Sequence, residues 1–208
     1  MDRPIPHLKI KASFCVSTSR EQVDFVCKLF ARYDKPWAIC GGWALSLWLG
    51  RQIRPHGDID IAVFRRDNDD LYGYLSEEWT LNYIDAGVEY PWTGELLQLP
   101  IHQIRGRNQT ANLDSLELLM NDASADTWLF RRNQNITYPI SNTILYTPDN
   151  IPIIAPEVAL LFKAKYNDEP KSDQDFQFIS PNLNNGQRSW LKSSLTVAYP
   201  DHIWTTNL

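Results

Sequence analysis

Residues 37–61 read WAICGGWALSLWLGRQIRPHGDIDI, and this stretch decides the fold. Its first four residues are apolar and predict a short buried strand. Gly41 and Gly42 follow at once, and the apolar run 43–49, closed by Gly50, predicts a short helix. Glycine at a strand-to-helix turn lets the backbone approach a bound group closely, and the free N–H groups of a helix N-terminus attract anions.

Two carboxylates follow a polar connection. Asp58 and Asp60 open the run 58–64, where acids alternate with isoleucines. Side chains two positions apart on a strand point to the same face. Carboxylate oxygens suit Mg²⁺, which completes its shell with water and substrate phosphates, and a second ion can share them. The pair alone also fits a solvated strand face, but beside the glycine turn it predicts a nucleoside-triphosphate site with a divalent metal.

The rest of the chain divides into a mixed part and a helical part. A helix over 20–33, with Ser19 as its cap, fits the apolar spacing. The other elements are predicted as an exposed helix over 67–76, strands over 79–86, 96–104, 115–120 and 127–131, short strands or a hairpin over 136–146, and helices from Pro156 and over 172–179 and 185–198. We expect an α+β fold with a core over 1–154 and a C-terminal helical region over 155–208.

Composition excludes several function classes. A chain of 208 residues with 43% hydrophobic residues can bury its own core. A net charge of −5 disfavours a broad nucleic-acid-binding surface. No apolar run approaches the roughly 20 residues that span a bilayer, and the N-terminus lacks a signal-peptide core. The three cysteines form no C-x-x-C pair, and no P-loop is present. We expect a cytoplasmic protein that does not bind membranes.

Residues 36–61 resemble the N-terminal signature of the aminoglycoside and lincosamide nucleotidyltransferases, which belong to the DNA polymerase β-type superfamily. The superfamily pattern is a Gly-Gly or Gly-Ser turn, a short helix and Asp-h-(Asp/Glu)-h, where h is apolar. It is matched position by position by Gly41, Gly42, Asp58 and Asp60. The Trp-Ala after the glycines and the Arg-x-His before Asp58 match the same subgroup. A looser likeness to C-terminal helices of relatives continues through 155–165, 171–176 and 188–191.

The resemblance implies a mixed, mainly antiparallel sheet flanked by helices, and transfer of a nucleoside monophosphate from an NTP to an acceptor hydroxyl. ATP is the commonest donor in relatives. Asp58 and Asp60 are then expected to hold Mg²⁺, as two ions, with a third carboxylate from a later strand. Glu117 is the best candidate for that third metal ligand and catalytic residue, and Asp114 is the alternative. A surface glutamate on an edge strand is a further interpretation of Glu117.

The acceptor class stays open at this stage. A small hydroxylated molecule, such as an aminoglycoside, is favoured, since antibiotic-modifying relatives use one. Superfamily members also act on RNA ends and on proteins, so a toxin-like nucleotidyltransferase is an alternative. A non-catalytic relative that only binds NTP is the third hypothesis.

Several other residues carry two interpretations each. The nucleotide-binding set implied by the resemblance is Gly41, Gly42, His56 and Lys163. Lys163 is expected to face the triphosphate or to be an ordinary lysine at a helix C-terminus. His56 either bonds a phosphate or orients Asp58, or it fixes the loop. Arg131 and Arg132 either line the pocket or are solvated, and His102 is expected to be an exposed strand residue.

Overall fold

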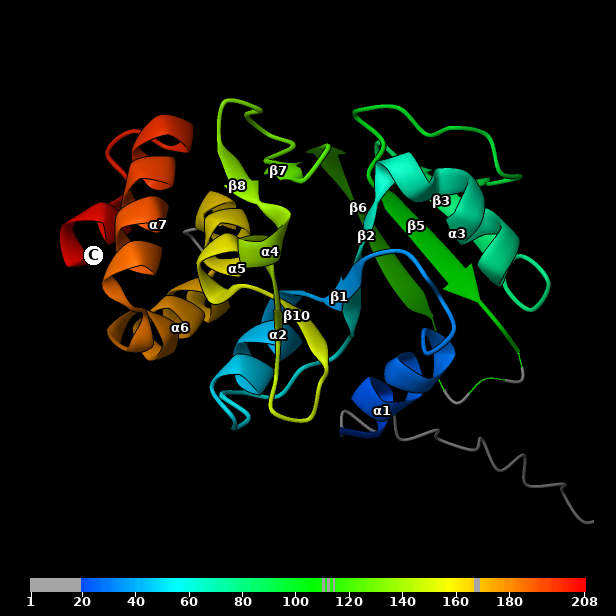
Figure 1. The fold of residues 1–208 in the computed structure, drawn as a ribbon, viewed down its shortest axis with the longest axis horizontal. Helices are drawn as coiled ribbons and strands as arrows, with labels where there is room; N and C mark the ends of the chain where they lie inside the picture. Colours follow the sequence, from blue (N-terminus) through cyan, green and yellow to red (C-terminus); the bar gives the residue numbers. More distant parts are fainter. Residues whose placement is uncertain (1–19, 110, 112, 114, 167–168) are drawn as a thin grey trace, which may run out of the picture.

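The computed structural model describes residues 20–208 except 110, 112, 114, 167 and 168 (Figure 1). Ser19 and Asp114 lie outside the described residues. Within the described residues, ten strands form one hydrogen-bonded sheet. In it β4-β3-β5-β6-β2-β1-β10-β9 run side by side, and β7 joins β6 to β8. The strands are β1 (Trp37–Ile39), β2 (Asp60–Phe64), β3 (Thr80–Asp85), β4 (Val88–Pro91), β5 (Gln103–Arg107), β6 (Leu116–Ser124), β7 (Thr127–Leu129), β8 (Thr137–Pro139), β9 (Ile144–Tyr146) and β10 (Pro152–Ile154).

The predicted sheet type is confirmed. The pairs β1–β10 and β2–β6 are parallel, and the other pairs in the described sheet are antiparallel. The helices are α1 (Arg20–Leu29), α2 (Gly41–Trp48), α3 (Asn68–Leu75), α4 (Ile140–Thr143), α5 (Pro156–Lys163), α6 (Pro170–Ile179) and α7 (Asn185–Ala198). Short 3₁₀ turns cover Arg65–Asp67, Ala164–Tyr166, Ser180–Asn182 and Ile203–Asn207.

Alternation along β2 assigns the two faces of the sheet. Ile61 and Val63 belong to a core shared with α1, α2 and α3, whereas Ala62 and Phe64 belong to a second core shared with α5, α6 and α7. Because side chains alternate along a strand, Asp60 lies on the same side as Ala62. The carboxylate therefore faces the C-terminal helices, which gather at one end of the molecule in Figure 1.

The structure corrects several predicted boundaries. The strand predicted over 96–104 is wrong, because its apolar residues lie mostly in a connection before β5 and a separate strand, β4, precedes them. Strand β10 and helix α4 were not predicted. The strand predicted over 58–64 begins only at Asp60, so Asp58 lies in the preceding loop. The helix predicted over 20–33 ends at Leu29.

The C-terminal residues are packed onto the helices rather than left free. Trp204 stacks on Phe176 with ring centroids 4.4 Å apart, and its indole N–H donates to Asp173 at 2.8 Å.

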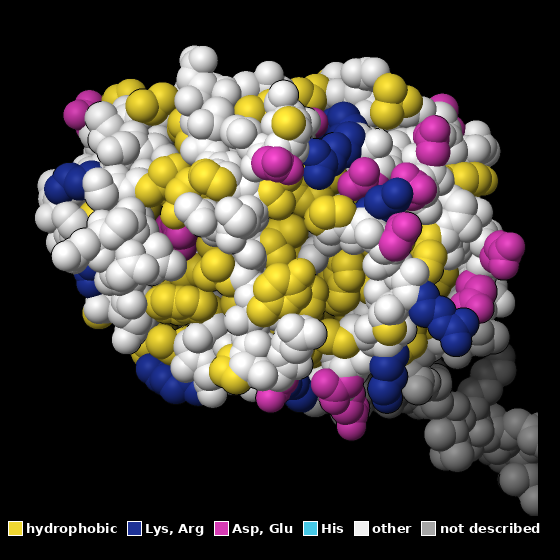
Figure 2. Space-filling model, viewed as in Figure 1, with side chains coloured by type: hydrophobic (Ala, Val, Ile, Leu, Met, Phe, Trp, Pro, Cys, Tyr) yellow, Lys and Arg dark blue, Asp and Glu magenta, His cyan; other side chains and the backbone are white. Residues whose placement is uncertain are grey.

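On the face seen in Figure 2, hydrophobic side chains gather across the middle. Within the described part of the chain, no helix is both long enough and apolar enough to cross a membrane.

Candidate active site

Asp60 and Gly41 are in direct contact at the start of β2. The backbone N–H of Cys40 donates to the Asp60 carbonyl at 2.8 Å, which holds the end of β1 beside the start of β2. Gly41 has a φ of +64°, and a Cβ on this residue would lie 2.4 Å from Asp60 Oδ2. Only glycine combines this backbone conformation with room for the carboxylate. The glycine turn and the acidic strand thus form one structure.

The carboxylates around Asp60 are crowded. The pKa of Asp60 is raised to about 6, mainly by burial and next by the negative charges of Asp58 and Glu117. Lys163 opposes them. Asp58 itself is exposed. A bound cation beside Asp58 and Asp60 would relieve this repulsion, since like-charged carboxylates at close range disfavour ionisation.

Glu117 lies beside Asp60 through strand pairing. In the parallel β2–β6 pair, Asp60 is in register with Glu117, and only 9% of Glu117 is exposed. Its carboxylate accepts hydrogen bonds from Gln103 Nε2 at 2.8 Å and from Arg105 Nε. Among the described residues, no group of three or more His, Cys, Asp or Glu side chains is arranged to hold a metal ion. In this conformation Glu117 is paired with Arg105.

A second close contact involves Gly42. A Cβ on Gly42 would lie 2.5 Å from His56 Nδ1 and 2.8 Å from Arg54 Nη2. His56 is 3% exposed, packs against the Trp43 ring at 4.8 Å, and has Nε2 2.8 Å from Ser46 Oγ. Burial, followed by the charge of Arg54, lowers the pKa of His56 to about 4. His56 is therefore neutral at pH 7 and joins the loop before β2 to α2.

Asp175 organises the cations behind this loop, and sequence reasoning missed it. Its carboxylate is fully buried and accepts two bonds from Arg54, at 2.8 Å from Nε and 2.9 Å from Nη2. Lys163 Nζ lies 2.8 Å from Oδ2, the same oxygen that accepts from Arg54 Nη2. One signal was available, because Ser172, Asp175 and Ile179 share the buried face of α6 at helical spacing. A carboxylate on a buried face requires a cationic partner.

A cavity of about 450 Å³ lies between the sheet and helices α5 and α6. Its lining includes Gly41, Asp60, His102, Gln103, Asn121, Arg131, Arg132, Phe162, Lys163, Tyr166, Glu169 and Lys171. Lys163 thus reaches the cavity that Asp60 faces. His102 is a half-buried residue of the cavity wall, so the expectation of an exposed strand residue is wrong.

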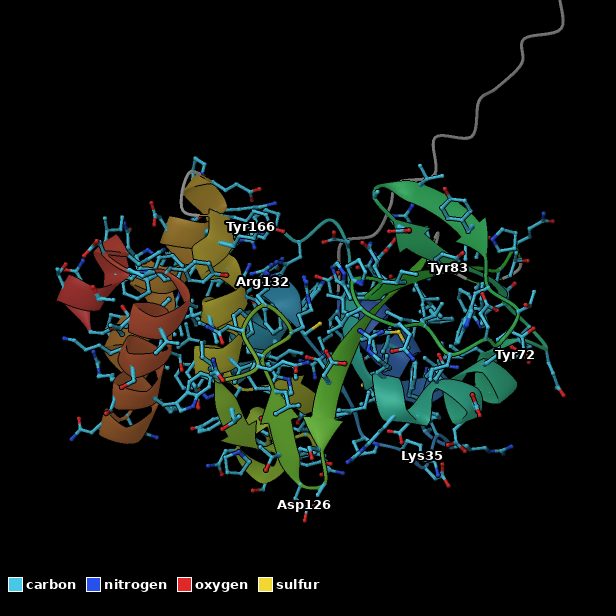
Figure 3. The ribbon with its side chains drawn as sticks, turned by 90° about the horizontal axis from the view of Figure 1, so that it is seen from above. Lys35, Tyr72, Tyr83, Asp126, Arg132 and Tyr166 are labelled. Carbon is cyan, nitrogen blue, oxygen red and sulfur yellow. The ribbon has the colours of Figure 1, made fainter. Side chains whose placement is uncertain are left out.

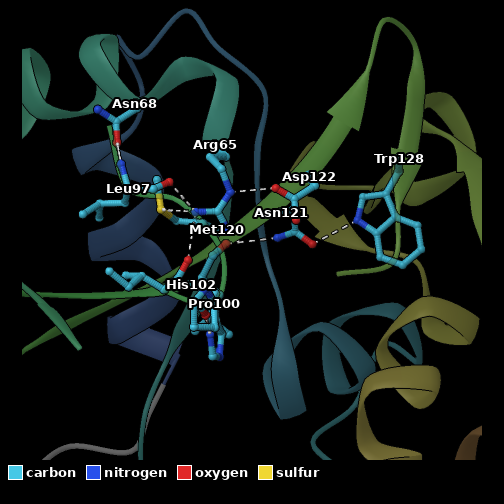
Figure 4. Close-up of polar contacts among 11 residues, drawn as sticks. Arg65, Asn68, Leu97, Pro100, His102, Met120, Asn121, Asp122 and Trp128 are labelled. Carbon is cyan, nitrogen blue, oxygen red and sulfur yellow. Dashed lines mark hydrogen bonds and ion pairs between the residues drawn. The ribbon is translucent and has the colours of Figure 1, made fainter. Parts of the chain in front are cut away.

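The segment before His102 is fixed by Arg65 (Figure 4). Arg65 Nε donates to Asp122 at 2.7 Å, and Nη1 donates to the carbonyls of Leu97 and Ile101 at 2.6 and 2.8 Å. His102 Nδ1 lies 2.9 Å from the Pro100 carbonyl oxygen. The irregular connection is therefore held to the ends of β2 and β6, and it places His102 at the cavity.

The sequence model of the aminoglycoside-2''-adenylyltransferase family matches residues 22–176, which include Gly41, Asp60, Glu117 and Asp175. The chain belongs to this family. It is therefore a nucleotidyltransferase, as the sequence resemblance implied. No curated protein matches the chain.

Solved structures show the same fold. ANT(2'')-Ia, crystallised with adenylyl-2''-tobramycin, is 14% identical, with a TM-score of 0.58 over 85% of this chain and 98% of its own. The lincosamide antibiotic adenylyltransferase LnuA, crystallised with lincomycin, is 18% identical, with a TM-score of 0.53 over 78% of this chain and 96% of its own. At these identities the likeness shows the fold alone. The α+β architecture predicted from sequence is confirmed.

Proposed function

We propose that this nucleotidyltransferase transfers AMP from ATP to a hydroxyl of a small antibiotic-like acceptor, in a Mg²⁺-dependent reaction. The observation that carries the proposal is the Asp60 carboxylate, which lies against the Gly41 turn and faces the cavity. Family membership supports adenylyl transfer. Of the two solved structures described above, one contains adenylyl-2''-tobramycin and the other is a lincosamide antibiotic adenylyltransferase. A volume of about 450 Å³ lies within the usual range for small-molecule sites.

The carboxylates fit a divalent metal. Asp58 and Asp60 supply hard oxygen ligands, and the raised pKa of Asp60 reflects burial and nearby negative charge that a cation would offset. We assign these two residues to Mg²⁺, shared by two ions, with Glu117 as the third carboxylate. When bound, the metal supplies charge neutralisation on the phosphates. The register of Glu117 with Asp60 supports its assignment, and Arg105 must then release it.

The protein's other contributions are positioning and charge. Gly41 and Gly42 add no side chains of their own at the N-terminus of α2, so Asp60, His56 and Arg54 can pack closely there. The backbone N–H groups of a helix N-terminus attract a phosphate. Lys163, held at the cavity wall by Asp175, supplies positive charge near the triphosphate. His56 contributes indirectly, because it fixes the loop that carries Asp58.

The direct test is an assay of pyrophosphate release. The purified protein is incubated with Mg²⁺ and ATP, with and without a panel of aminoglycosides and lincosamides, and acceptors are examined by mass spectrometry for an added AMP group. We expect acceptor-dependent release that Asp58→Ala and Asp60→Ala reduce by at least a hundredfold. Asp85→Ala, an exposed carboxylate at the end of β3, is the control and should keep full activity. Pyrophosphate release that persists in Asp60→Ala would contradict the assignment of Asp60 to the metal. If no acceptor in the panel is turned over, the proposal of a small antibiotic-like acceptor is contradicted.

A matched pair of glycine variants tests the turn itself. Gly41 and Gly50 both have positive φ, at +64° and +70°, so alanine strains the backbone similarly at each. A Cβ at Gly41 meets Asp60, whereas one at Gly50 meets no described atom within 4 Å. Gly41→Ala should therefore lose activity at least tenfold more than Gly50→Ala. Equal losses would show that contact with Asp60 is unimportant.

A further inference from the structure

Arg131 and Arg132 form an unusual pair in the loop after β7. Both line the cavity that contains Asp60, and both also line a second cavity of about 310 Å³ with Lys165 and Tyr199. The two arginines therefore form a wall that the two cavities share. Asp60 and Gly41 border only the first.

Arg132 is held in a fixed position. Its Nη1 donates to the Phe162 carbonyl at 2.9 Å and to the Tyr199 hydroxyl at 3.1 Å. Its guanidinium lies over the rings of Phe162 and Tyr166, 5.4 and 5.6 Å from their centroids, and Figure 3 shows Arg132 beside Tyr166. Arg131 also lies over the Phe162 ring, 5.8 Å from its centroid. Aromatic stacking leaves guanidinium N–H groups free to bind an anion.

No carboxylate of the described residues forms an ion pair with Arg131 or Arg132, although both arginines are half-buried. The charge of Asp122 does act on Arg131, but this carboxylate is already paired with Arg65. Burial, followed by the charge of Arg132, lowers the pKa of Arg131. Two adjacent guanidinium groups at a partly buried site are unfavourable without an anion.

Other sheltered arginines of this protein provide an internal comparison. Arg54 pairs with Asp175 at 2.8 Å, and Arg65 pairs with Asp122 at 2.7 Å. Both side chains are less than 20% exposed, at 17% and 11%. The fold therefore gives its sheltered arginines an aspartate partner, and the cavity-lining pair departs from this pattern.

We propose that Arg131 and Arg132 form the site that binds the β- and γ-phosphates of the NTP and holds pyrophosphate until it leaves. This rests on the proposed function. The acceptor oxygen bonds to the α-phosphorus and loses its proton to a base. The bond from that phosphorus to the bridging oxygen breaks, and its electron pair stays on pyrophosphate. Paired guanidinium groups match this growing charge, because their N–H groups bind phosphate oxygens in parallel.

Calorimetric titrations without metal isolate the protein's own contribution. ATP, AMP and inorganic pyrophosphate are titrated, in EDTA, into the wild type, Arg131→Gln, Arg131→Lys and the control Arg32→Gln, an exposed arginine of the segment after α1. We expect Arg131→Gln to weaken ATP and pyrophosphate binding about tenfold and to leave AMP within twofold. Arg131→Lys should recover part of the affinity, and Arg32→Gln should match the wild type. Arg131→Gln is the main variant because Arg132 also anchors the loop.

The outcomes separate this site from the proposed reaction. Unchanged pyrophosphate binding in Arg131→Gln overturns the site, even if the wild type transfers AMP. Equal weakening of AMP overturns it as well, since the pair would then contact the nucleoside or its α-phosphate. A wild type that binds none of the three probes overturns it too. If the selective loss occurs but no acceptor is ever modified, the polyphosphate site stands and the proposed reaction fails.

Discussion

Asp175 shows how one residue can control the charge at a site it does not line. It is fully buried, and both of its oxygens accept hydrogen bonds from Arg54, which contacts the Gly42 region. Its Oδ2 also pairs with Lys163, which lines the cavity. Its two partners carry one more positive charge than it neutralises. Asp175 therefore fixes the position of Lys163 while leaving net positive charge beside the cavity.

Replacing this carboxylate by an amide should destabilise the protein in a pH-dependent way. Burial raises the pKa of Asp175, but Arg54 and Lys163 outweigh burial and lower it below the ordinary value of 3.8. Stability from this group is therefore fully present above about pH 4 and is lost as pH falls through the lower folded-state pKa. We expect Asp175→Asn to reduce the free energy of unfolding by about 3 kcal/mol at pH 7, because two sheltered cations lose their partner.

Urea denaturation of both proteins between pH 3 and pH 7 measures this difference. The gap between wild type and Asp175→Asn should narrow as the solution becomes more acidic. Asp126→Asn, at an exposed turn before β7, serves as the control and should shift stability by less than about 0.5 kcal/mol. A gap that stays constant to pH 3 would mean that the ionised carboxylate is not what stabilises the fold.

At the scale of elements, prediction succeeded where local pattern determines structure. Gly41, Asp60 and Pro156 mark their elements through turn chemistry, alternation and a proline at the first turn of α5. The strand prediction failed over 96–104, because Leu97 is buried although it belongs to an irregular connection and not to a strand. An apolar run in a core-facing loop has the same composition as a strand, and only its hydrogen-bond partners distinguish the two.

The site was predictable to the extent that its residues are close in sequence. Gly41 and Asp60 belong to one strand–helix–strand unit, so their contact follows from a local motif. Arg54 and Asp175 are 121 positions apart, and their pairing requires α6 to pack beside α2. A single sequence contains no local signal for that pairing beyond an acid on a buried helix face.

The N-terminus of α7 gives a prediction at this scale. The Asn184 side chain accepts a hydrogen bond from the Gln187 backbone N–H at 3.0 Å, and Gln187 Oε1 accepts one from the Asn184 backbone N–H at 3.0 Å. Asn184→Ala should lower the free energy of unfolding by about 1 kcal/mol, as loss of such a cap usually does. Pyrophosphate release should stay unchanged, because neither residue lines the cavity with Asp60. Asn185→Ala, one position on, should cost less than half as much, and equal costs in chemical denaturation would argue against the cap.

At the scale of the whole molecule, the cavity lies between the sheet and the C-terminal helices, on the side of the second core. Asp60 comes from the sheet, Lys163 comes from α5, and Arg132 comes from the loop after β7. A ligand that contacts all three holds the sheet and the C-terminal helices together. Ligand binding to the folded state alone raises stability by an amount set by its concentration relative to Kd.

Mg-ATP should therefore raise the melting temperature of the wild type more than ATP in EDTA does. At a hundred times Kd the gain is about 2.7 kcal/mol, which corresponds to a shift of roughly 5 °C or more for a domain of this size. In Asp60→Ala the extra effect of Mg²⁺ should vanish while the metal-free effect of ATP remains, since the arginine pair is intact. In Arg131→Gln the rise in melting temperature caused by metal-free ATP should be smaller than in the wild type, and the extra rise caused by Mg²⁺ should remain. If Mg²⁺ increases the stabilisation of Asp60→Ala as much as that of the wild type, the metal is held elsewhere, and the carboxylate that faces the cavity has another role.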